Sequence, residues 1–376
     1  MPKTKTPAVG PESLADVLNE KAERLSLADE HRLQRENREL RANLGAALES
    51  RELDANYEAF VTQALARSAR VPDWVRKPLA KGRRHPALPV TLFSDWHLDE
   101  VVDPKQVNGR NGYGRAIAEK RLRRYFEAVI TVARDYVKGF EYPGIVVGML
   151  GDNFSGHIHE ELRNTNADVM LSSLLHWIGP VAAGLKLLAD EFGHVFIPVV
   201  VGNHGRNSVK PIAKMRIRDN FDWLFAQMLA RHFEDRGDRR FTWLIGESHK
   251  CQFSLYDTRV IASHGDECKG GSGIAGMLSP QLIAFSRMKK QFEFDLWCLG
   301  HWHQRGSYRG IRVNGTGKGF DEYSAVMNFD YQTPQQDFFL VAPGRGVISD
   351  WPIFCQCDDE PWAKRVRGAV PFQAGG

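Results

Sequence analysis

The stretch GIVVGMLGDNFSG, residues 144–156, runs from an apolar segment straight into an aspartate and an asparagine. Residues 144–150 have the composition of a buried strand, and Asp152 follows them after a single glycine. Asp152 could be a turn residue or a helix cap, or it could carry a charge that the strand delivers to a site. The other apolar segments of the chain decide between these interpretations.

Four further apolar segments end in polar residues that can bind metal ions. Residues 90–93 lead into SDWH (94–97), 195–201 into GNH (202–204), 260–262 into SHGD (263–266), and 296–299 into GHWH (300–303). Helical patterns lie between the segments, at 116–138, 166–192 and 213–235. Short strands that alternate with helices predict a layered α/β fold, in which ligands gather beyond the carboxyl ends of the strands. All five polar clusters occupy such ends.

Each cluster is a weak signal by itself, because an aspartate or histidine after a strand is more often a turn residue, a cap or a satisfied side chain. Together the clusters supply seven nitrogen and oxygen donors and no cysteine: Asp95, His97, Asp152, Asn203, His264, His301 and His303. Such donors suit a borderline or hard divalent ion. Seven are too many for one tetrahedral zinc ion that stays open to substrate, and they suit two ions if one carboxylate bridges them.

In this order, across residues 91–304, the motifs resemble those of the calcineurin-like metallophosphoesterase superfamily. The resemblance implies an α/β fold, a layered β-sandwich flanked by helices, with an N-terminal helical extension outside the match. It implies that the first metal is held by Asp95, His97 and His303, and the second by Asn203, His264 and His301. Asp152 would bridge both ions. His204 is similar to the family's histidine that contacts phosphate and acts as a general acid.

Two positions separate the chain from the protein serine/threonine phosphatases of that superfamily. Ser155 stands where those enzymes carry the second aspartate of GDxVDRG, and Gly205 where they carry the glutamate of GNHE. The sequence DWHL at 95–98 is similar to the repair-exonuclease branch, in which His157 could take the part of an additional active-site histidine. Residues 316–342 resemble metallophosphoesterases encoded by bacteriophages, and we expect them to add strands to the second half of the sheet.

These features predict a dinuclear-metal-dependent phosphoesterase, with a phosphodiesterase or nuclease acting on DNA as the first expectation. The two divalent ions, expected to be Mn²⁺ with Fe, Zn, Co, Ni or Mg as alternatives, would clamp the phosphoryl group and activate a bridging hydroxide for in-line attack. His204 would protonate the leaving alkoxide. The alternatives are a phosphomonoesterase or nucleotide pyrophosphatase and, in another class, a non-catalytic scaffold that binds nucleic acid or protein.

The distribution of charge favours a polyanionic substrate more than the total charge does. The chain has 50 Lys and Arg residues against 46 Asp and Glu residues, a net charge of +4. Basic residues nevertheless gather beside the motifs, at Arg110, Arg115, Arg206, Lys210, Lys214, Arg216, Arg218, Arg305, Arg309, Arg312 and Lys318. Such a rim fits a nucleic-acid backbone, with Arg206 and His157 as candidate phosphate contacts, and an ordinary solvated surface is the alternative.

The remaining sequence divides into flanking segments and loops. Residues 1–80 predict a helical extension with a short coiled-coil-like seam at 33–47, which either packs on the main domain or joins two copies of the chain. A basic linker with two prolines at 81–89 leads to the metallophosphoesterase domain at 90–355 and a tail at 356–376. Three glycine-rich loops, 108–114, 269–276 and 314–319, either close over a substrate or simply connect strands.

The cysteines and the N-terminus indicate the compartment. The five cysteines form no CxxC pair, so neither a zinc finger nor a disulfide framework is predicted. The N-terminus lacks the apolar core of a signal peptide, and no apolar run approaches the roughly 20 residues that span a bilayer. We therefore expect a cytoplasmic protein without a membrane partner, located in the host cytoplasm if a phage encodes it.

Overall fold

The computed structural model describes residues 70–363, apart from residues 80–81, 83, 157, 159–161, 163–164, 271–272 and 328, together with Arg38. All of these except Arg38 belong to the second of two compact units, Ser68–Gly376. The predicted seam at 33–47, apart from Arg38, and the candidate phosphate contact His157 lie outside the described residues. The predicted domain boundaries and the role of the helical extension therefore stay predictions.

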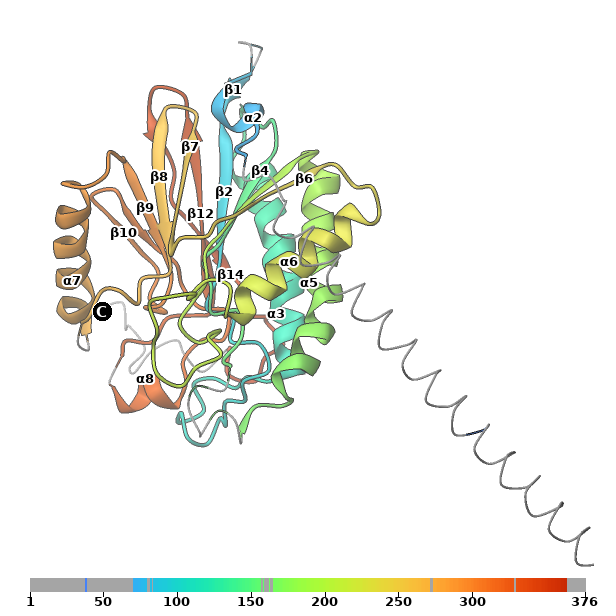
Figure 1. Ribbon diagram of the computed structural model, residues 1–376, viewed down its shortest axis with the longest axis vertical. Coiled ribbons are helices and arrows are strands. Elements are labelled where there is room, and N and C mark those ends of the chain that lie inside the picture. Colours follow the sequence, from blue (N-terminus) through green and yellow to red (C-terminus); the bar gives the residue numbers. More distant parts are fainter. Residues whose placement is uncertain are drawn as a thin grey trace, which may run out of the picture. The chain divides into compact units, whose positions relative to one another are not determined.

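The larger of two main sheets has a parallel centre (Figure 1). Its strand order is β13-β12-β2-β4-β5-β6, with β14 also paired to β12. Strands β2, β4, β5 and β6 run parallel, whereas β12 is antiparallel to β2, β13 and β14. The strands are β2 (Leu88–Phe93), β4 (Ile145–Met149), β5 (Val195–Val199), β6 (Phe241–Ile245), β12 (Gln335–Ala342), β13 (Gly346–Val347) and β14 (Trp351–Phe354).

The second sheet has the order β10-β11-β9-β8-β7. Its inner strands β8, β9 and β11 run parallel, and β7 and β10 close its two edges in the antiparallel direction. The strands are β7 (Lys250–Leu255), β8 (Thr258–Ser263), β9 (Leu296–Leu299), β10 (Gly306–Tyr308) and β11 (Ile311–Val313). A separate short parallel pair joins β1 (His85–Pro86), which lies within the predicted linker, to β3 (Phe140–Glu141), which lies in the main domain.

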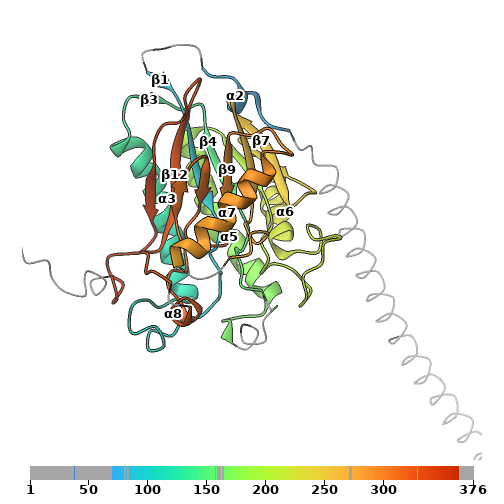
Figure 2. The ribbon, with the colours of Figure 1, turned by 90° about the vertical axis from the view of Figure 1, so that its left-hand side faces the viewer.

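Helices cover the outer faces of the two sheets (Figures 1 and 2). Helices α3, α5 and α6 pack on the larger sheet, and α7 packs on the smaller one. Their bounds are α3 (Arg115–Thr131, continued by a π-helical turn at Val132–Tyr136), α5 (Met170–Phe192), α6 (Phe221–Glu234) and α7 (Gly273–Met288), and the short helices are α2 (Asp73–Arg76) and α8 (Glu322–Val326). This unit is therefore an α/β sandwich flanked by helices. The predicted fold class is confirmed for it, and the predicted N-terminal helical extension, apart from Arg38 and residues 70–79, lies outside the described residues.

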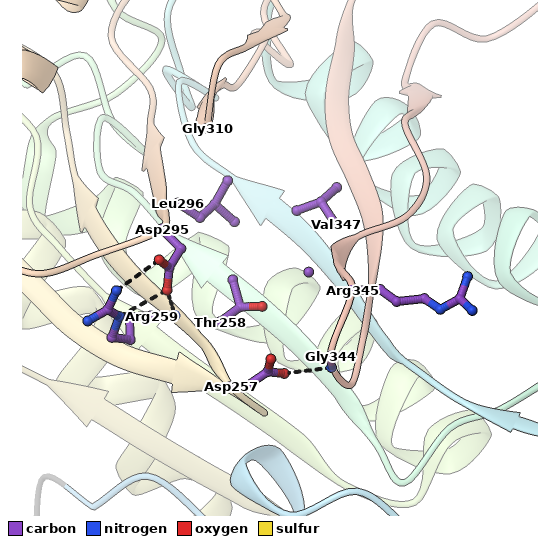
Figure 3. A pocket seen from close by; sticks show the side chains of 10 residues that line it. Asp257, Thr258, Arg259, Asp295, Leu296, Gly310, Gly344, Arg345 and Val347 are labelled. Atoms are coloured by element: carbon purple, nitrogen blue, oxygen red, sulfur yellow. Dashed lines mark hydrogen bonds and ion pairs between the residues drawn. The ribbon is translucent and has the colours of Figure 1, made fainter.

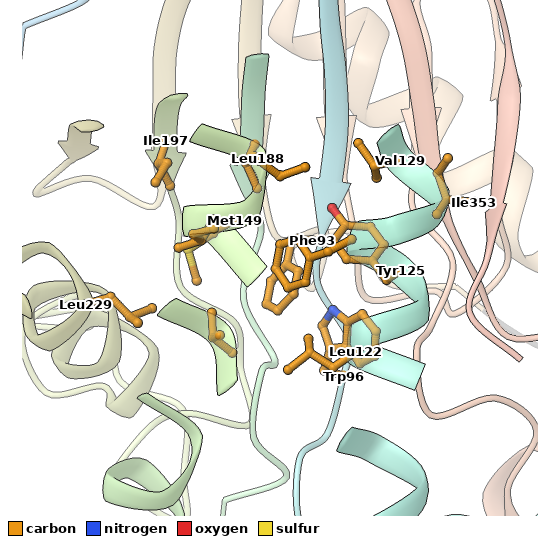
Figure 4. Packing of buried hydrophobic residues seen from close by; sticks show 14 of the residues in the cluster. Phe93, Trp96, Leu122, Tyr125, Val129, Met149, Leu188, Ile197, Leu229 and Ile353 are labelled. Carbon is orange, nitrogen blue, oxygen red and sulfur yellow. The ribbon is translucent and has the colours of Figure 1, made fainter. Parts of the chain in front are cut away.

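Side chains at successive strand positions face opposite layers, as the two-residue period of a strand requires. In β4, Ile145, Val147 and Met149 pack with the helices, whereas Val146, and Leu150 directly after the strand, face the smaller sheet. Figure 4 shows the helix-facing layer, in which Met149 lies among side chains of the surrounding helices and strands. Each fully buried branched side chain contributes roughly 1.5–3 kcal/mol, so the strands form a rigid platform for the loops that follow them.

Two expectations about individual elements are corrected by the structure. The helix predicted at 213–235 begins only at Phe221, because Asn220 has extended backbone and its side chain accepts a hydrogen bond from Asp222 N–H as a cap. Within 316–342, the long strand β12 pairs with β2 in the larger sheet instead of extending the second half. The residues before β12 form loops and the short helix α8.

By length and composition alone, helix α5 is long and apolar enough to cross a membrane. This differs from the expectation that no apolar run approaches the length of a membrane span. One face of it is buried, with Leu174, Trp177 and Leu185 in the core between the helices and the larger sheet. Core helices pass the same test, so the finding is weak evidence for a membrane span.

Candidate metal centre

The polar clusters predicted from the sequence meet at one edge of the sandwich. Strands β2, β4 and β5 are parallel neighbours, so the loops after them emerge side by side. Hydrogen bonds from main-chain N–H groups join these loops to each other and to the loop after β9. Asp95 N–H donates to Gly151 O at 3.1 Å, and His301 N–H donates to Asp95 Oδ1 at 2.9 Å.

The first group of metal-competent side chains is Asp95, His97 and His303, whose ligand atoms all lie within 4.8 Å of one another. His97 Nε2 is 3.1 Å from His303 Nε2, and His303 Nε2 is 3.5 Å from Asp95 Oδ1. Asp95 and His97 are buried, while His303 is partly exposed. These are the three residues that the resemblance assigns to the first metal.

The second group is Asp152, His264 and His301, again with ligand atoms within 4.8 Å of one another. Asn203 joins it, because Asn203 Oδ1 lies 3.1 Å from His264 Nε2. His264 Nε2 also lies 2.8 Å from Asp152 Oδ2. The structure thus gathers all seven predicted donors into two adjacent groups, and a shared role for Asp152 stays a prediction.

The backbone at these donors is unusual. Asp95, His97, Asp152, His301 and His303 all have φ between 46° and 70°, the left-handed region that non-glycine residues rarely adopt. Each such residue costs on the order of 1–3 kcal/mol and persists only where its surroundings over-determine it. Strain concentrated on five of seven donors favours the hypothesis that this edge is a functional site.

The surroundings of His264 fit a cation. Its Nδ1–H donates to Leu150 O at 2.7 Å, so Nε2 faces two oxygen acceptors, Asp152 Oδ2 and Asn203 Oδ1. Burial lowers the pKa of His264, but the nearby Asp152 carboxylate outweighs it and raises that pKa well above the ordinary value. A proton on Nε2 therefore occupies the place that a metal ion would take between the same three atoms.

Two other histidines, His97 and His301, are held in the form that binds metals. Burial, followed by the charge of Lys318, keeps the pKa of His97 well below its ordinary value. Burial and the neighbouring His264 lower the pKa of His301 to about 4. Neutral imidazole is the metal-binding species, so these two rings need no deprotonation to act as ligands.

Asp152 is buried and ionised. Burial would raise its pKa, but the imidazoles of His264 and His204 outweigh that effect and hold the pKa well below its usual range. Its Oδ1 accepts the main-chain N–H of His204 at 2.7 Å. Gly202 is required beside it, because a Cβ on that residue would overlap Asp152 Oδ1.

Asp222, at the start of α6, is a part of the site that sequence reasoning missed. This buried carboxylate accepts main-chain N–H groups from Asp152, Asn153 and Gly202 at 2.9–3.1 Å, and also the Asn153 side-chain amide at 2.9 Å. It therefore fixes the loops that carry both the GDN and the GNH motifs. An aspartate twenty residues after a motif carries no local signal that would reveal this role.

His204 lies beside the two groups. Its ring centroid is 4.9 Å from that of His97, and its Nδ1 is 3.1 Å from the main-chain oxygen of Ser155, which can only accept. The ring is therefore oriented by the GDN loop, and its assignment as the phosphate-contacting histidine stays a prediction.

Many of the basic side chains that the sequence places beside the motifs are held by internal partners. Arg206 donates three hydrogen bonds to main-chain oxygens within residues 203–209. Arg216 pairs with Asp266 at 2.6 Å, and Lys318 is buried against two carboxylates. Carboxylate partners also hold Arg115, Arg218, Arg305 and Arg312. The basic rim is thus smaller than the sequence suggests.

Two of the glycine-rich loops support the site: loop 314–319 is buried throughout, and loop 108–114 is buried at residues 111–113. In loop 314–319, Thr316 Oγ1 donates to Asp95 O at 2.7 Å, and Gly317 lies where a Cβ would overlap the ring of Trp96. In loop 108–114, Asn111 Nδ2 donates to Lys318 O at 3.0 Å. The two loops lock together, so of the two alternatives they act as connections. The third loop, 269–276, includes residues outside the described part of the chain.

A cavity of about 520 Å³ lies elsewhere (Figure 3). It is lined by the turn at Asp257–Arg259, by the start of β9 and by the turn at Gly344–Val347. Thr258 and Leu296 are the first residues of β8 and β9, whereas the metal-competent groups follow the last residues of the same strands. The cavity therefore lies at the opposite strand ends and takes no part in the centre.

Comparison with known proteins gives a limited result. No family model and no curated protein matches the chain. Twelve solved chains match, among them a single mutant of Vps29 from Entamoeba histolytica (11% identity, 70% of this chain and 97% of that chain, TM-score 0.28). Vps29 from Cryptosporidium parvum has 11% identity over 68% of this chain and 86% of its own, with a TM-score of 0.29. A Streptococcus pneumoniae TIGR4 protein described as a predicted phosphoesterase has 11% identity over 71% of this chain and 98% of its own, with a TM-score of 0.26.

Proposed function

We propose that this chain is a dinuclear-metal-dependent phosphoesterase. The observation that carries the proposal is the pair of adjacent donor groups, made of imidazoles, carboxylates and one amide oxygen, with five of the donors on strained backbone. Strained backbone persists only where the surroundings over-determine it, as they do where side chains must be held in a fixed arrangement. The order of the five motifs along the chain supports the same assignment.

Two divalent ions bound there would polarise phosphoryl oxygens and lower the pKa of a water molecule. The residues of the chain would do the rest. Asp152, ionised and buried, would be shared by the two ions. His204 would contact the phosphate. With Nδ1–H given to Ser155 O, His204 would act as a general acid in its imidazolium form, by transferring the second proton from Nε2 to the leaving alkoxide.

We further propose phosphodiesters as the substrate class, with DNA as the first substrate to test. Lys210 and Lys214 are exposed on the loop that follows His204, where they could meet a phosphate backbone. The resemblance of the 95–98 motif to repair exonucleases supports the same substrate.

A phosphomonoesterase or nucleotide pyrophosphatase is the second candidate. The observation that favours it is the internal pairing of Arg115, Arg206, Arg216 and Arg218, which removes much of the positive surface that a long polyanion would contact. A small substrate needs only the ions and His204.

One experiment separates these candidates. Purified protein is loaded with Mn²⁺, the metal we propose for this mixture of imidazole and carboxylate donors, and its metal content is measured. Hydrolysis of bis-p-nitrophenyl phosphate, p-nitrophenyl phosphate, a nucleotide and single- and double-stranded DNA is then compared. Cleavage of the monoester or nucleotide alone would refute the nuclease proposal. A protein that binds Mn²⁺ and cleaves none of these substrates would favour a non-catalytic scaffold.

A further inference from the structure

The two donor groups differ in what holds the far side of their buried histidines. His264 Nδ1–H is taken by a main-chain oxygen, that of Leu150, at 2.7 Å. His97 Nδ1 instead lies 2.9 Å from Ser155 Oγ, and Ser155 Oγ contacts Glu100 Oε2. One ring is oriented by the backbone and the other by a chain of side chains.

Counting protons fixes the direction of this side-chain relay. Lys318 Nζ donates to Glu100 Oε1 at 2.8 Å, so Glu100 acts as a carboxylate that can only accept. Ser155 has a single hydroxyl proton, which it donates to Glu100 Oε2. His97 Nδ1 therefore carries a proton that it donates to Ser155 Oγ, and His97 Nε2 presents a lone pair toward His303.

The relay is closed to water. The exposed fractions are 0% for Ser155, 1% for His97, 3% for Lys318 and 7% for Glu100. A buried ammonium group is tolerated only when it is paired, and Lys318 has a second carboxylate partner, Asp321, at 2.6 Å. Because every charge has a partner in one arrangement, the relay holds Glu100 and Ser155 rigidly behind His97.

We propose that Ser155, Glu100 and Lys318 are positioning residues for only one of the two metal ions, the ion held by Asp95, His97 and His303. The inference rests on the proposed dinuclear centre. Without the relay, the His97 ring can rotate or change tautomer, and outer partners of this kind typically account for 10–100-fold in metal affinity. The other group keeps its main-chain acceptor, Leu150 O, which no side-chain substitution removes.

The test is a titration of the metal-free full-length protein with Mn²⁺, followed by calorimetry and by electron paramagnetic resonance. The wild type is expected to bind two ions and to show the spectrum of a spin-coupled pair. Ser155→Ala and Glu100→Gln are expected to weaken one ion about 10–100-fold and to leave the other unchanged, so that an uncoupled Mn²⁺ spectrum persists at intermediate metal concentration. In Ser155→Ala, Glu100 Oε2 could accept the proton of His97 Nδ1 directly, because the two atoms are only 3.4 Å apart. Glu100→Gln is therefore tested as a second variant.

A matched control is Tyr125→Phe, which removes a buried hydroxyl that contacts Thr91 and Leu92 but none of the donors. It should lower thermal stability and leave both Mn²⁺ affinities intact. The double variant Ser155→Ala/Glu100→Gln should lose little more than the worse single variant, because both act through one relay.

The outcomes separate this inference from the proposed function. Equal weakening of both ions, or unchanged affinities in both single variants, would overturn the relay while leaving the phosphoesterase proposal intact. Selective loss of one ion in a protein that cleaves no phosphate ester would overturn the proposed function and support the relay. A wild type that binds no Mn²⁺ would overturn both.

Discussion

The carboxylate of Asp222 offers a direct test of how the site is built. It accepts four N–H groups, three from the main chain of the GDN and GNH loops and one from the Asn153 amide. Asp222 Oδ2 accepts the main-chain N–H groups of Asp152 and Gly202, and Asp222 Oδ1 accepts the main-chain and side-chain N–H groups of Asn153. We expect Asp222→Asn to destabilise the protein and to weaken metal binding, since both loops depend on this group.

The magnitude follows from the number of lost acceptors. An asparagine keeps one acceptor oxygen, and its NH₂ group faces the other two N–H groups in either orientation. Two buried donors left without partners cost about 1–3 kcal/mol each, or roughly 2–6 kcal/mol in the free energy of unfolding. Burial and the charge of Asp152 raise the pKa of Asp222, so removing its charge relieves part of this loss. The lower half of the range is therefore expected.

The assay is urea unfolding of the metal-free protein at pH 7, together with a Mn²⁺ titration. Asp235→Asn, at the exposed C-terminal end of the same helix, makes the same chemical change and is expected to shift the free energy of unfolding by less than about 0.5 kcal/mol. If Asp222→Asn proved as stable as this control and bound Mn²⁺ normally, the carboxylate would not be organising the two loops.

Three further predictions follow from other residues. His204→Ala should lower turnover by about 10²–10⁴-fold with both ions still bound, and loss of metal in elemental analysis would instead assign His204 to the structure of the site. Gly300→Ala should displace Asp95 and weaken Mn²⁺ binding, because the new Cβ would overlap Asp95 Oδ2 and lie 2.7 Å from Ser94 Oγ. The control Gly179→Ala, whose Cβ would have nothing within 4 Å, should bind Mn²⁺ normally. Equal Mn²⁺ affinities of the two variants in calorimetry would contradict this reasoning. The hydrogen bond from Arg259 lowers the pKa of Asp295 from 3.8 to about 2, so this carboxylate stabilises the fold above its ordinary pKa and loses that effect as pH falls toward 2. The stability difference between wild type and Asp295→Asn, measured by denaturant unfolding, should therefore be constant above about pH 5 and shrink below pH 4, and a difference independent of pH would exclude the ion pair as its source.

The layered fold and the donor residues could be predicted because both leave local signals. Each donor follows a short apolar strand, and parallel strands bring their carboxyl ends to one edge whatever the loops contain. Asp152 after residues 144–150 and His301 after 296–299 are weak signals singly, and they become recognisable because five such clusters follow five apolar segments. The left-handed backbone at these residues could not be predicted, because glycine is the usual sign of that conformation.

The supporting residues could not be predicted because their partners are distant in sequence. Lys318 looks like a surface charge beside a glycine-rich loop, yet its partner Glu100 lies 218 residues earlier. Arg312 likewise pairs with Asp337, across 25 residues and two strands. A basic residue in a buried ion pair and one exposed to solvent can have the same local sequence. The sequence therefore predicts more solvent-exposed basic residues beside the motifs than the structure has. The position of β12 beside β2 is a long-range pairing of the same kind.

The antiparallel strand β12 has a consequence for the synthesis of this protein. Ser94 N–H, next to the first donor, is taken by Gln336 Oε1, 242 residues later, and Asp95 O by Thr316 Oγ1, 221 residues later. At about 5–20 residues per second, roughly 12–48 s separate the emergence of these segments from a ribosome. During that interval the nascent chain carries Asp95 and His97 on a loop that lacks its C-terminal support. The candidate site therefore gains this support only after residues 316–336 have been synthesised.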